Sequence, residues 1–77
     1  MKLLIIDSKN KCESIYIMES DNVAKLKEEI KLKYNVIGDI ELVFNGNILM
    51  DNDSLIEKGI RDGNTINFLG QFNAGIL

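Results

Sequence analysis

Few side chains in this sequence could carry out covalent or acid–base chemistry. Cys12 is the only cysteine and histidine is absent, so the thiol has no imidazole partner to activate it as a nucleophile. Asp51 and Asp53 are close enough in sequence to suggest paired catalytic carboxylates. They lie, however, in a turn-like segment where Asp commonly bonds to neighbouring backbone groups. We therefore expect no enzymatic activity, cofactor or metal, and we interpret Cys12 as a small packing residue in a strand.

The composition predicts one small globular domain. The chain has 77 residues, of which 45% are hydrophobic and 27% are charged, proportions that are typical of folded globular proteins. A domain of this size buries only about 60% of the surface of its unfolded chain, which leaves little room for an enclosed pocket. The net charge of −3 offers no basic surface to nucleic acid or to an anionic membrane. We expect protein partners and a monomer.

The first residues and the cysteine content suggest where the protein is located. The apolar run over residues 3–6 stops at Asp7 and is too short for the hydrophobic segment of a signal peptide. No run of residues is long enough to span a membrane as an apolar helix. One cysteine cannot form an internal disulfide, which suits a reducing compartment. We expect the cytosol, the nucleus or both.

An amphipathic helix is predicted over residues 20–35. Apolar residues recur there with helical spacing, and lysines and glutamates fill the intervening positions. The apolar stripe consists of Val23, Leu26 and Ile30. Asn22 can cap the first turn through its side-chain oxygen, and Asn35 can adopt the left-handed conformation that ends a helix. Because so short a helix is marginal alone, the flanking segments must supply an apolar surface for it.

Strands are predicted on both sides of that helix, at residues 2–6, 12–18, 41–44, 48–49 and 65–69. Residues 7–10 have turn-forming side chains and join the first two strands into a hairpin. Asn45-Gly46 is a strong turn signal between the third and fourth strands. A right-handed crossover through the helix then brings the strands into one mixed sheet.

The alternation within the strands and the stripe on the helix together define the predicted core. Its members are Leu3, Ile5, Ile15, Ile17, Val23, Leu26, Ile30, Leu42, Leu49, Leu55, Ile60, Ile66 and Phe68. Glu13 has the same parity as Ile15 and Ile17 and would also point inward. That placement conflicts with its charge unless Glu13 lies at the end of the sheet or a bulge shifts the register.

These elements resemble a known family. The features that carry the resemblance are the opening hairpin, the helix start Ser20-Asp21-Asn22-Val23, the segment Leu42-Val43-Phe44-Asn45-Gly46, and Leu49, Asp51, Leu55, Ile60 and Asn64-Thr65-Ile66. In order and spacing the chain is similar to ubiquitin and its relatives, with one apparent deletion between Asn35 and Glu41. The resemblance implies an α+β fold of the β-grasp type, in which a mixed sheet packs on one helix. It places a ubiquitin-like domain at residues 1–70 and a flexible C-terminal tail at 71–77.

The resemblance also implies a docking surface on the outer face of the sheet. Ubiquitin carries an apolar patch there that receptors and enzymes grip, and the similar positions here are Val43 and Leu69, with Gly46 and Asn67 nearby. Ser8 stands where the family has a leucine, and Asn67 where it often has a histidine. The resemblance therefore implies a smaller patch than that of ubiquitin.

The charges around that surface also differ from those of ubiquitin. Glu41, Asn47 and Gln71 occupy positions at which ubiquitin is cationic. Receptors that recognise the positive rim of ubiquitin should bind this chain poorly, because charge complementarity selects partners. The alternative interpretation is that Val43 and Leu69 are incidentally exposed, as single apolar residues on protein surfaces commonly are.

The C-terminal segment suggests attachment to other proteins. Conjugated relatives of ubiquitin end in two glycines, and by spacing Ala74 and Gly75 lie where ubiquitin carries that pair. The resemblance implies a modifier precursor that forms an isopeptide bond through Gly75 after removal of Ile76 and Leu77. The arginines that the ubiquitin tail presents to its activating enzyme are absent, so a tolerant or dedicated enzyme would be required. Alternatively, this segment is a frayed end without chemistry.

The sequence is also compatible with two other functions. One is a non-covalent interaction domain that uses Val43 and Leu69, and the other, weaker one is a sulfur carrier of related fold. Some lysines match those on which ubiquitin accepts further modifiers, namely Lys11, Lys27 and Lys33. Surface lysines more often only contribute to solubility.

Overall fold

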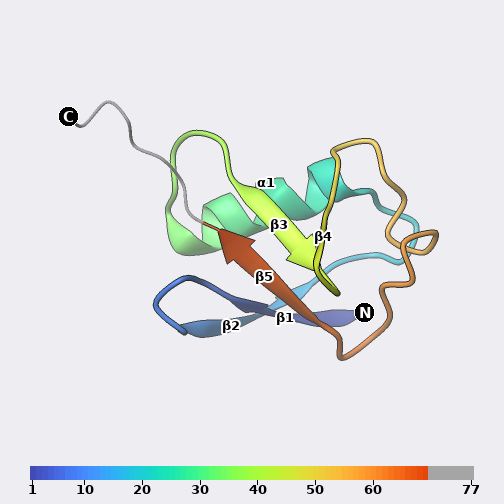
Figure 1. Ribbon diagram of the computed structural model, residues 1–77, viewed down its shortest axis with the longest axis horizontal. Coiled ribbons are helices and arrows are strands. Elements are labelled where there is room, and N and C mark those ends of the chain that lie inside the picture. Colours follow the sequence, from blue (N-terminus) through green and yellow to red (C-terminus); the bar gives the residue numbers. More distant parts are fainter. Residues whose placement is uncertain (70–77) are drawn as a thin grey trace.

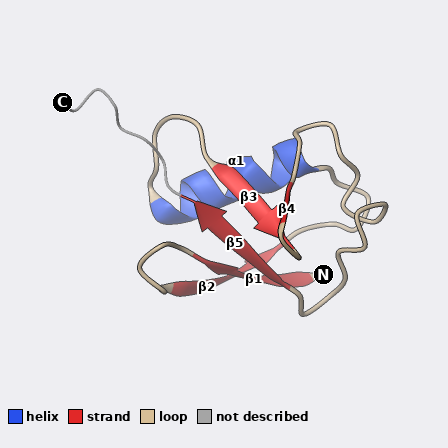
Figure 2. Ribbon diagram, viewed as in Figure 1, coloured by secondary structure: helices blue, strands red, loops and turns tan. Residues whose placement is uncertain are grey.

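A five-stranded sheet and one helix make up the part of the chain that this computed structural model describes, residues 1–69. The elements are β1 (Lys2–Ile6), β2 (Cys12–Tyr16), α1 (Val23–Tyr34), β3 (Glu41–Phe44), β4 (Asn47–Ile48) and β5 (Thr65–Leu69). The strand order is β2-β1-β5-β3-β4, in which β1 and β5 run parallel and the other neighbours run antiparallel. Helix α1 crosses one face of the sheet (Figure 1, Figure 2). The predicted α+β fold of the β-grasp type is confirmed.

Helix α1 has the two ends that the sequence indicates. The Asn22 side-chain oxygen accepts a hydrogen bond from the backbone N–H of Lys25 at 3.0 Å, which satisfies one free donor of the first turn. Asn35 adopts the left-handed conformation, with φ 61°, and its backbone N–H donates to Leu32. The predicted range of 20–35 is longer than the helix because Asn22 has extended backbone angles and the chain becomes helical only at Val23.

The core lies between α1 and the sheet and contains every residue predicted for it. Its members are Leu3, Ile5, Ile15, Ile17, Val23, Leu26, Ile30, Ile40, Leu42, Leu49, Leu55, Ile60, Ile66 and Phe68. Ile40 was not predicted because it precedes β3 in the connection. It has the same parity as Leu42, however, so the chain already directs it inward. Tyr34, at the end of α1, packs its ring edge-to-face on Phe68 with 5.1 Å between the ring centroids.

The two hairpins form with slightly different strand ends from those predicted. β2 ends at Tyr16, although Ile17 still bonds to Met1, with its N–H donating to the Met1 carbonyl at 2.9 Å. β4 is Asn47–Ile48, one residue earlier than predicted. Asn45 and Gly46 have φ of 53° and 81°, the positive values that a two-residue hairpin turn requires.

Cys12 and Glu13 are the two β2 residues whose positions were uncertain or misassigned from the sequence. Cys12 is exposed, so its assignment as a packing residue is wrong: it pairs with Ile6 at the outer edge of the sheet, in the parity that faces away from α1. Glu13 has the inward parity but lies at the end of the sheet, where its side chain keeps 33% exposure and its carboxylate is 3.9 Å from the Lys11 ammonium. The register of β1 and β2 is continuous and contains no bulge. The charge of Glu13 is therefore accommodated because the residue lies near the end of the sheet.

Candidate protein-docking surface

One row of side chains crosses the face of the sheet that α1 leaves open. The register pairs Ile6 with Asn67, Asn67 with Val43, and Val43 with Ile48, so these side chains are cross-strand neighbours on one face. Leu69 is two residues along β5 from Asn67 and points to the same side. We name Ile6, Val43, Ile48, Asn67 and Leu69 the outer-face patch.

A hollow of about 300 Å³ opens within the outer-face patch. Its lining brings together four of the five residues predicted to bind partners, Ser8, Val43, Asn67 and Leu69. The fifth, Gly46, is exposed in the β3–β4 turn and does not line the hollow. Leu69 retains 42% of its surface exposed. The structure therefore assembles these residues from the β1–β2 loop, β3 and β5 at one solvent-accessible place.

Two apolar members of the patch were not predicted as site residues, Ile6 and Ile48. Both follow from alternation, because Ile6 has the parity opposite to buried Ile5 and Ile48 has the parity opposite to buried Leu49. Ile48 is 54% exposed. The signal was therefore present in the sequence, and the patch is more apolar than the resemblance alone implied.

Among residues 1–69, a single charged side chain lines the hollow, and it is a carboxylate. Asp7 lines it, and one of its oxygens accepts the backbone N–H groups of Lys9 and Lys11 at 2.9 and 2.8 Å, which holds the loop that carries Ser8. Glu41 lies opposite Leu69 in the register. No lysine or arginine lines the hollow among residues 1–69. The lack of a cationic rim there agrees with what the resemblance implied.

Tyr34 ties the β1–β2 loop to the helix behind it. Its hydroxyl donates to the carbonyl of Ile5 at 3.0 Å and lies 3.3 Å from that of Lys11. Burial raises the pKa of the Tyr34 phenol above its usual value, and the nearby negative charges of Asp7 and Glu13, together with Cys12, raise it further. The neutral phenol is therefore the form that holds the loop beside the patch.

The predicted acceptor lysines are dispersed, and none of them lines the hollow. The Lys27 ammonium is 2.7 Å from the Asp51 carboxylate and its side chain is only 21% exposed, so it is poorly placed to accept a modifier. Lys11 is exposed in the β1–β2 loop, and Lys33 is exposed in the last turn of α1. Lys11 follows Asn10, which lines the hollow, in the β1–β2 loop, whereas Lys27 and Lys33 belong to α1.

The two aspartates considered for catalysis are engaged locally. Asp53 accepts the backbone N–H of Met50 at 2.8 Å and lies 3.7 Å from the Lys58 ammonium, which is the local bonding that the sequence indicates. Asp51 is held by Lys27. Across residues 1–69 no cluster of three or more potential metal ligands is found, and no helix is long and apolar enough to cross a membrane. Ala74 and Gly75 lie outside the described residues.

Comparison with known proteins identifies the family. The sequence profile of the ubiquitin family matches residues 4–72. Ubiquilin-1 of Rattus norvegicus is 36% identical over 70 residues, which cover 90% of this chain and 12% of that protein. Ubiquilin-4 of Mus musculus is 38% identical over 58 residues, covering 74% of this chain and 10% of the relative. This chain thus spans about a tenth of the length of these relatives. Its fold, its profile match and these identities agree: the chain belongs to the ubiquitin family.

Proposed function

We propose that this chain is a non-covalent protein-docking domain that binds its partners through the outer-face patch. The observation that carries the proposal is the row from Ile6 to Ile48 across the open face, with a hollow that Ile6, Val43, Asn67 and Leu69 of the patch line. Apolar side chains gathered on a face are a common mark of an interaction site, and their removal from water favours association. A partner that inserts an apolar side chain between Val43 and Leu69 fits this surface.

The comparisons support docking better than conjugation. The relatives resemble this chain over a segment that is about a tenth of their length, as expected for a binding domain within a longer protein. A modifier, by contrast, must present its own C-terminal glycine. The modifier prediction depends on Gly75, on removal of Ile76 and Leu77, and on the acceptor lysines. Because that glycine lies outside residues 1–69, the geometry adds no support to it.

The proposal also covers the oligomeric state, the absence of catalysis, the location and the class of partner. The protein acts as a monomer without enzymatic activity, in the cytosol or nucleus, and binds neither nucleic acid nor membranes. The net charge of −3 supports protein partners over polyanions, and a single cysteine suits a reducing compartment. The predicted tail, residues 71–77, lies outside the described residues.

Affinity capture with a matched pair of variants tests the docking proposal. The bait is the tagged chain in an extract of the host, and captured proteins are purified and their affinities measured. Val43→Ala with Leu69→Ala should abolish binding while shifting the melting temperature by only a few degrees, because both side chains are partly exposed. The control, Met18→Ala with Ile56→Ala, also removes two exposed apolar side chains and should bind normally. Equal affinities for the two double variants would reject the patch.

The intact mass of the protein from its host separates docking from conjugation. Docking predicts one unmodified mass for the chain, and for the Gly75→Ala variant the same single species, heavier only by the added methylene group. Loss of Ile76 and Leu77, or a series of heavier adducts that Gly75→Ala abolishes, would favour the modifier instead.

A further inference from the structure

A hollow of about 500 Å³ lies where the sheet ends at β4. Residues 39–41 line it from the segment that leads into β3, residues 48–52 line it from β4 and the loop that follows, and Lys27 lines it from α1. No other described strand covers the outer side of β4 (Figure 1). We name this place the β4 hollow, and it is open to a partner from the side of the sheet.

Two apolar side chains remain exposed at the β4 hollow. Ile48 is 54% exposed and Met50 is 63% exposed. Leu49 lies between them in sequence and is buried, and its backbone N–H donates to the carbonyl of Leu42 at 2.9 Å. Because successive side chains of an extended segment point to opposite sides, the pairing that buries Leu49 turns Ile48 and Met50 outward. The hollow therefore offers apolar surface that a partner can remove from water.

The lining of the β4 hollow is negatively charged, and its charges are only partly paired. The Lys27 ammonium is 2.7 Å from the Asp51 carboxylate, and the Lys27 side chain is only 21% exposed. Lys27 is the only cationic side chain among the described residues that line the hollow. Asp39 and Glu41 are exposed and have no ion-pair partner within residues 1–69. Two carboxylates are therefore available to a ligand.

The acidic character extends along the chain around the β4 hollow. Residues 34–57 contain no lysine or arginine, and they carry all of the following carboxylates: Asp39, Glu41, Asp51, Asp53 and Glu57. The net charge of the whole chain is only −3, so negative charge is concentrated in this segment. A surface of one sign attracts ligands of the opposite sign. The ligand that complements the β4 hollow is therefore cationic.

An arginine side chain matches both the charge and the apolar surface of the β4 hollow. Its planar guanidinium can donate paired hydrogen bonds to a carboxylate, which the compact ammonium of lysine cannot do with the same geometry. Its aliphatic stem can cover apolar surface while the charged head stays in a polar environment. At this site the head would meet Asp39 and Glu41, and the stem would cover Ile48 and Met50.

We propose that the β4 hollow docks a protein segment in which an arginine adjoins an apolar side chain. The guanidinium pairs with Asp39 and Glu41, and the apolar neighbour packs on Ile48 and Met50. The β4 hollow shares no lining residue with the hollow of the outer-face patch, although Ile48 belongs to both surfaces. This inference therefore goes beyond the proposed docking function and describes a second contact surface on the same domain.

An NMR titration of the full chain tests this inference. The probe is a short blocked peptide that alternates leucine with arginine, titrated to millimolar concentration. We expect amide shifts in residues 39–41 and 48–52, which decrease as added salt screens the exposed charges. The same peptide with citrulline in place of arginine keeps the shape but loses the charge and should not bind. A peptide with lysine in place of arginine should bind less tightly.

Matched variants separate the β4 hollow from the charge of the whole chain. Asp39→Asn with Glu41→Gln should weaken binding of the arginine peptide about fivefold, because two exposed ion pairs are lost. Glu19→Gln with Glu57→Gln removes the same charge from exposed positions that do not line the hollow and should leave the affinity unchanged. Melting curves confirm that both variants are folded.

A second matched pair tests the apolar contact. Met50→Ala should weaken binding of the arginine peptide, since it removes apolar surface from the β4 hollow. Met18→Ala is the control, because Met18 is 66% exposed and does not line the hollow. Equal affinities for these two variants would reject the predicted contact with Met50.

Several results would overturn the proposal. These are an absence of shifts, binding of the citrulline or lysine peptide as tightly as the arginine peptide, or equal weakening by the two pairs of carboxylate substitutions. Shifts confined to the outer-face patch would also overturn it. Val43→Ala with Leu69→Ala should leave peptide binding unchanged, because neither side chain lines the β4 hollow. Failure of this proposal and failure of the docking function are therefore distinguishable.

Discussion

At the scale of single residues, Tyr34 links the ionisation of one phenol to the stability of the fold. Its folded-state pKa lies above the ordinary value of 10.0, chiefly because burial disfavours the phenolate. As pH rises, the unfolded chain therefore loses this proton before the folded chain does. The contribution of Tyr34 to stability is full below about pH 10 and is lost as the pH rises through the folded-state pKa.

A spectroscopic titration of the phenolate tests that sign. The chain has two tyrosines, so in the Tyr16→Phe variant Tyr34 is the only residue that can form a phenolate. We expect its titration midpoint in the folded protein to exceed the midpoint in denaturant. Coincident midpoints, or a lower midpoint in the folded protein, would show that the phenol is not protected by its position between Ile5 and Lys11.

Ile30 is one of the core residues whose truncation should destabilise the fold strongly. It is fully buried on the inner side of α1, and Ile30→Ala should lower the free energy of unfolding by about 2 to 5 kcal/mol because it leaves a cavity. A small domain has only roughly 5 kcal/mol in total. Urea denaturation measures the change. The control on the same helix is Leu32→Ala, which removes a 76% exposed side chain and should change stability by less than about 0.5 kcal/mol.

At the scale of elements, the ends of α1 depend on single side chains. Asn22→Ala removes the acceptor for the Lys25 N–H and should cost about 1 kcal/mol, whereas Asn22→Asp keeps an acceptor and should cost much less. Asn52→Ala is the control, because Asn52 is exposed in a loop. Chemical denaturation of the three variants gives the comparison. Equal loss in Asn22→Ala and Asn22→Asp would mean that the cap contributes little.

The elements were largely predictable from the sequence because local signals and burial agree. The helix stripe, the Asn45-Gly46 turn and strand alternation each specify one arrangement, and all the predicted core residues are buried. Strand ends were less predictable, since pairing across the sheet decides them: Ile17 bonds to Met1 beyond the end of β2. Cys12 was misplaced because its type suits either side of a strand, although its parity, opposite to that of buried Ile15 and Ile17, indicates the outer side.

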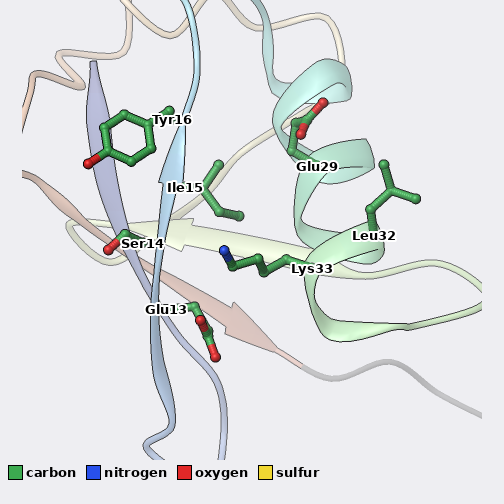
Figure 3. A pocket seen from close by; sticks show the side chains of 7 residues that line it. All are labelled: Glu13, Ser14, Ile15, Tyr16, Glu29, Leu32 and Lys33. Carbon is green, nitrogen blue, oxygen red and sulfur yellow. The ribbon is translucent and has the colours of Figure 1, made fainter.

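The candidate site was predictable only in part. The positions of Val43, Asn67 and Leu69 came from a resemblance, and the structure brings them together with Ser8. Ile48 was missed although its parity, opposite to that of buried Leu49, already indicated an outward side chain, and the structure pairs it with Val43. The hollow between β2 and α1 (Figure 3) was not apparent from the sequence because it depends on which strand is left at the edge and on how α1 lies beside it.

At the scale of the whole molecule, one helix covers one face of the sheet, and the opposite face and one edge remain accessible. The same burial that fixes Leu42 and Ile66 in the core directs their neighbours Val43 and Asn67 outward. The outer-face patch is therefore a consequence of strand alternation. In the docking proposal, its partner preference depends on positions such as Ser8 and Glu41, where the residue differs from the one that the resemblance implies.

The most direct test of the docking account is a methyl NMR map of the chain bound to a purified partner from the capture experiment. The account predicts that the methyl resonances of Ile6, Val43, Ile48 and Leu69 shift or broaden on binding, while those of Leu32 keep their positions. Perturbation confined to Leu32 and its surroundings, with the outer-face patch unchanged, would contradict it.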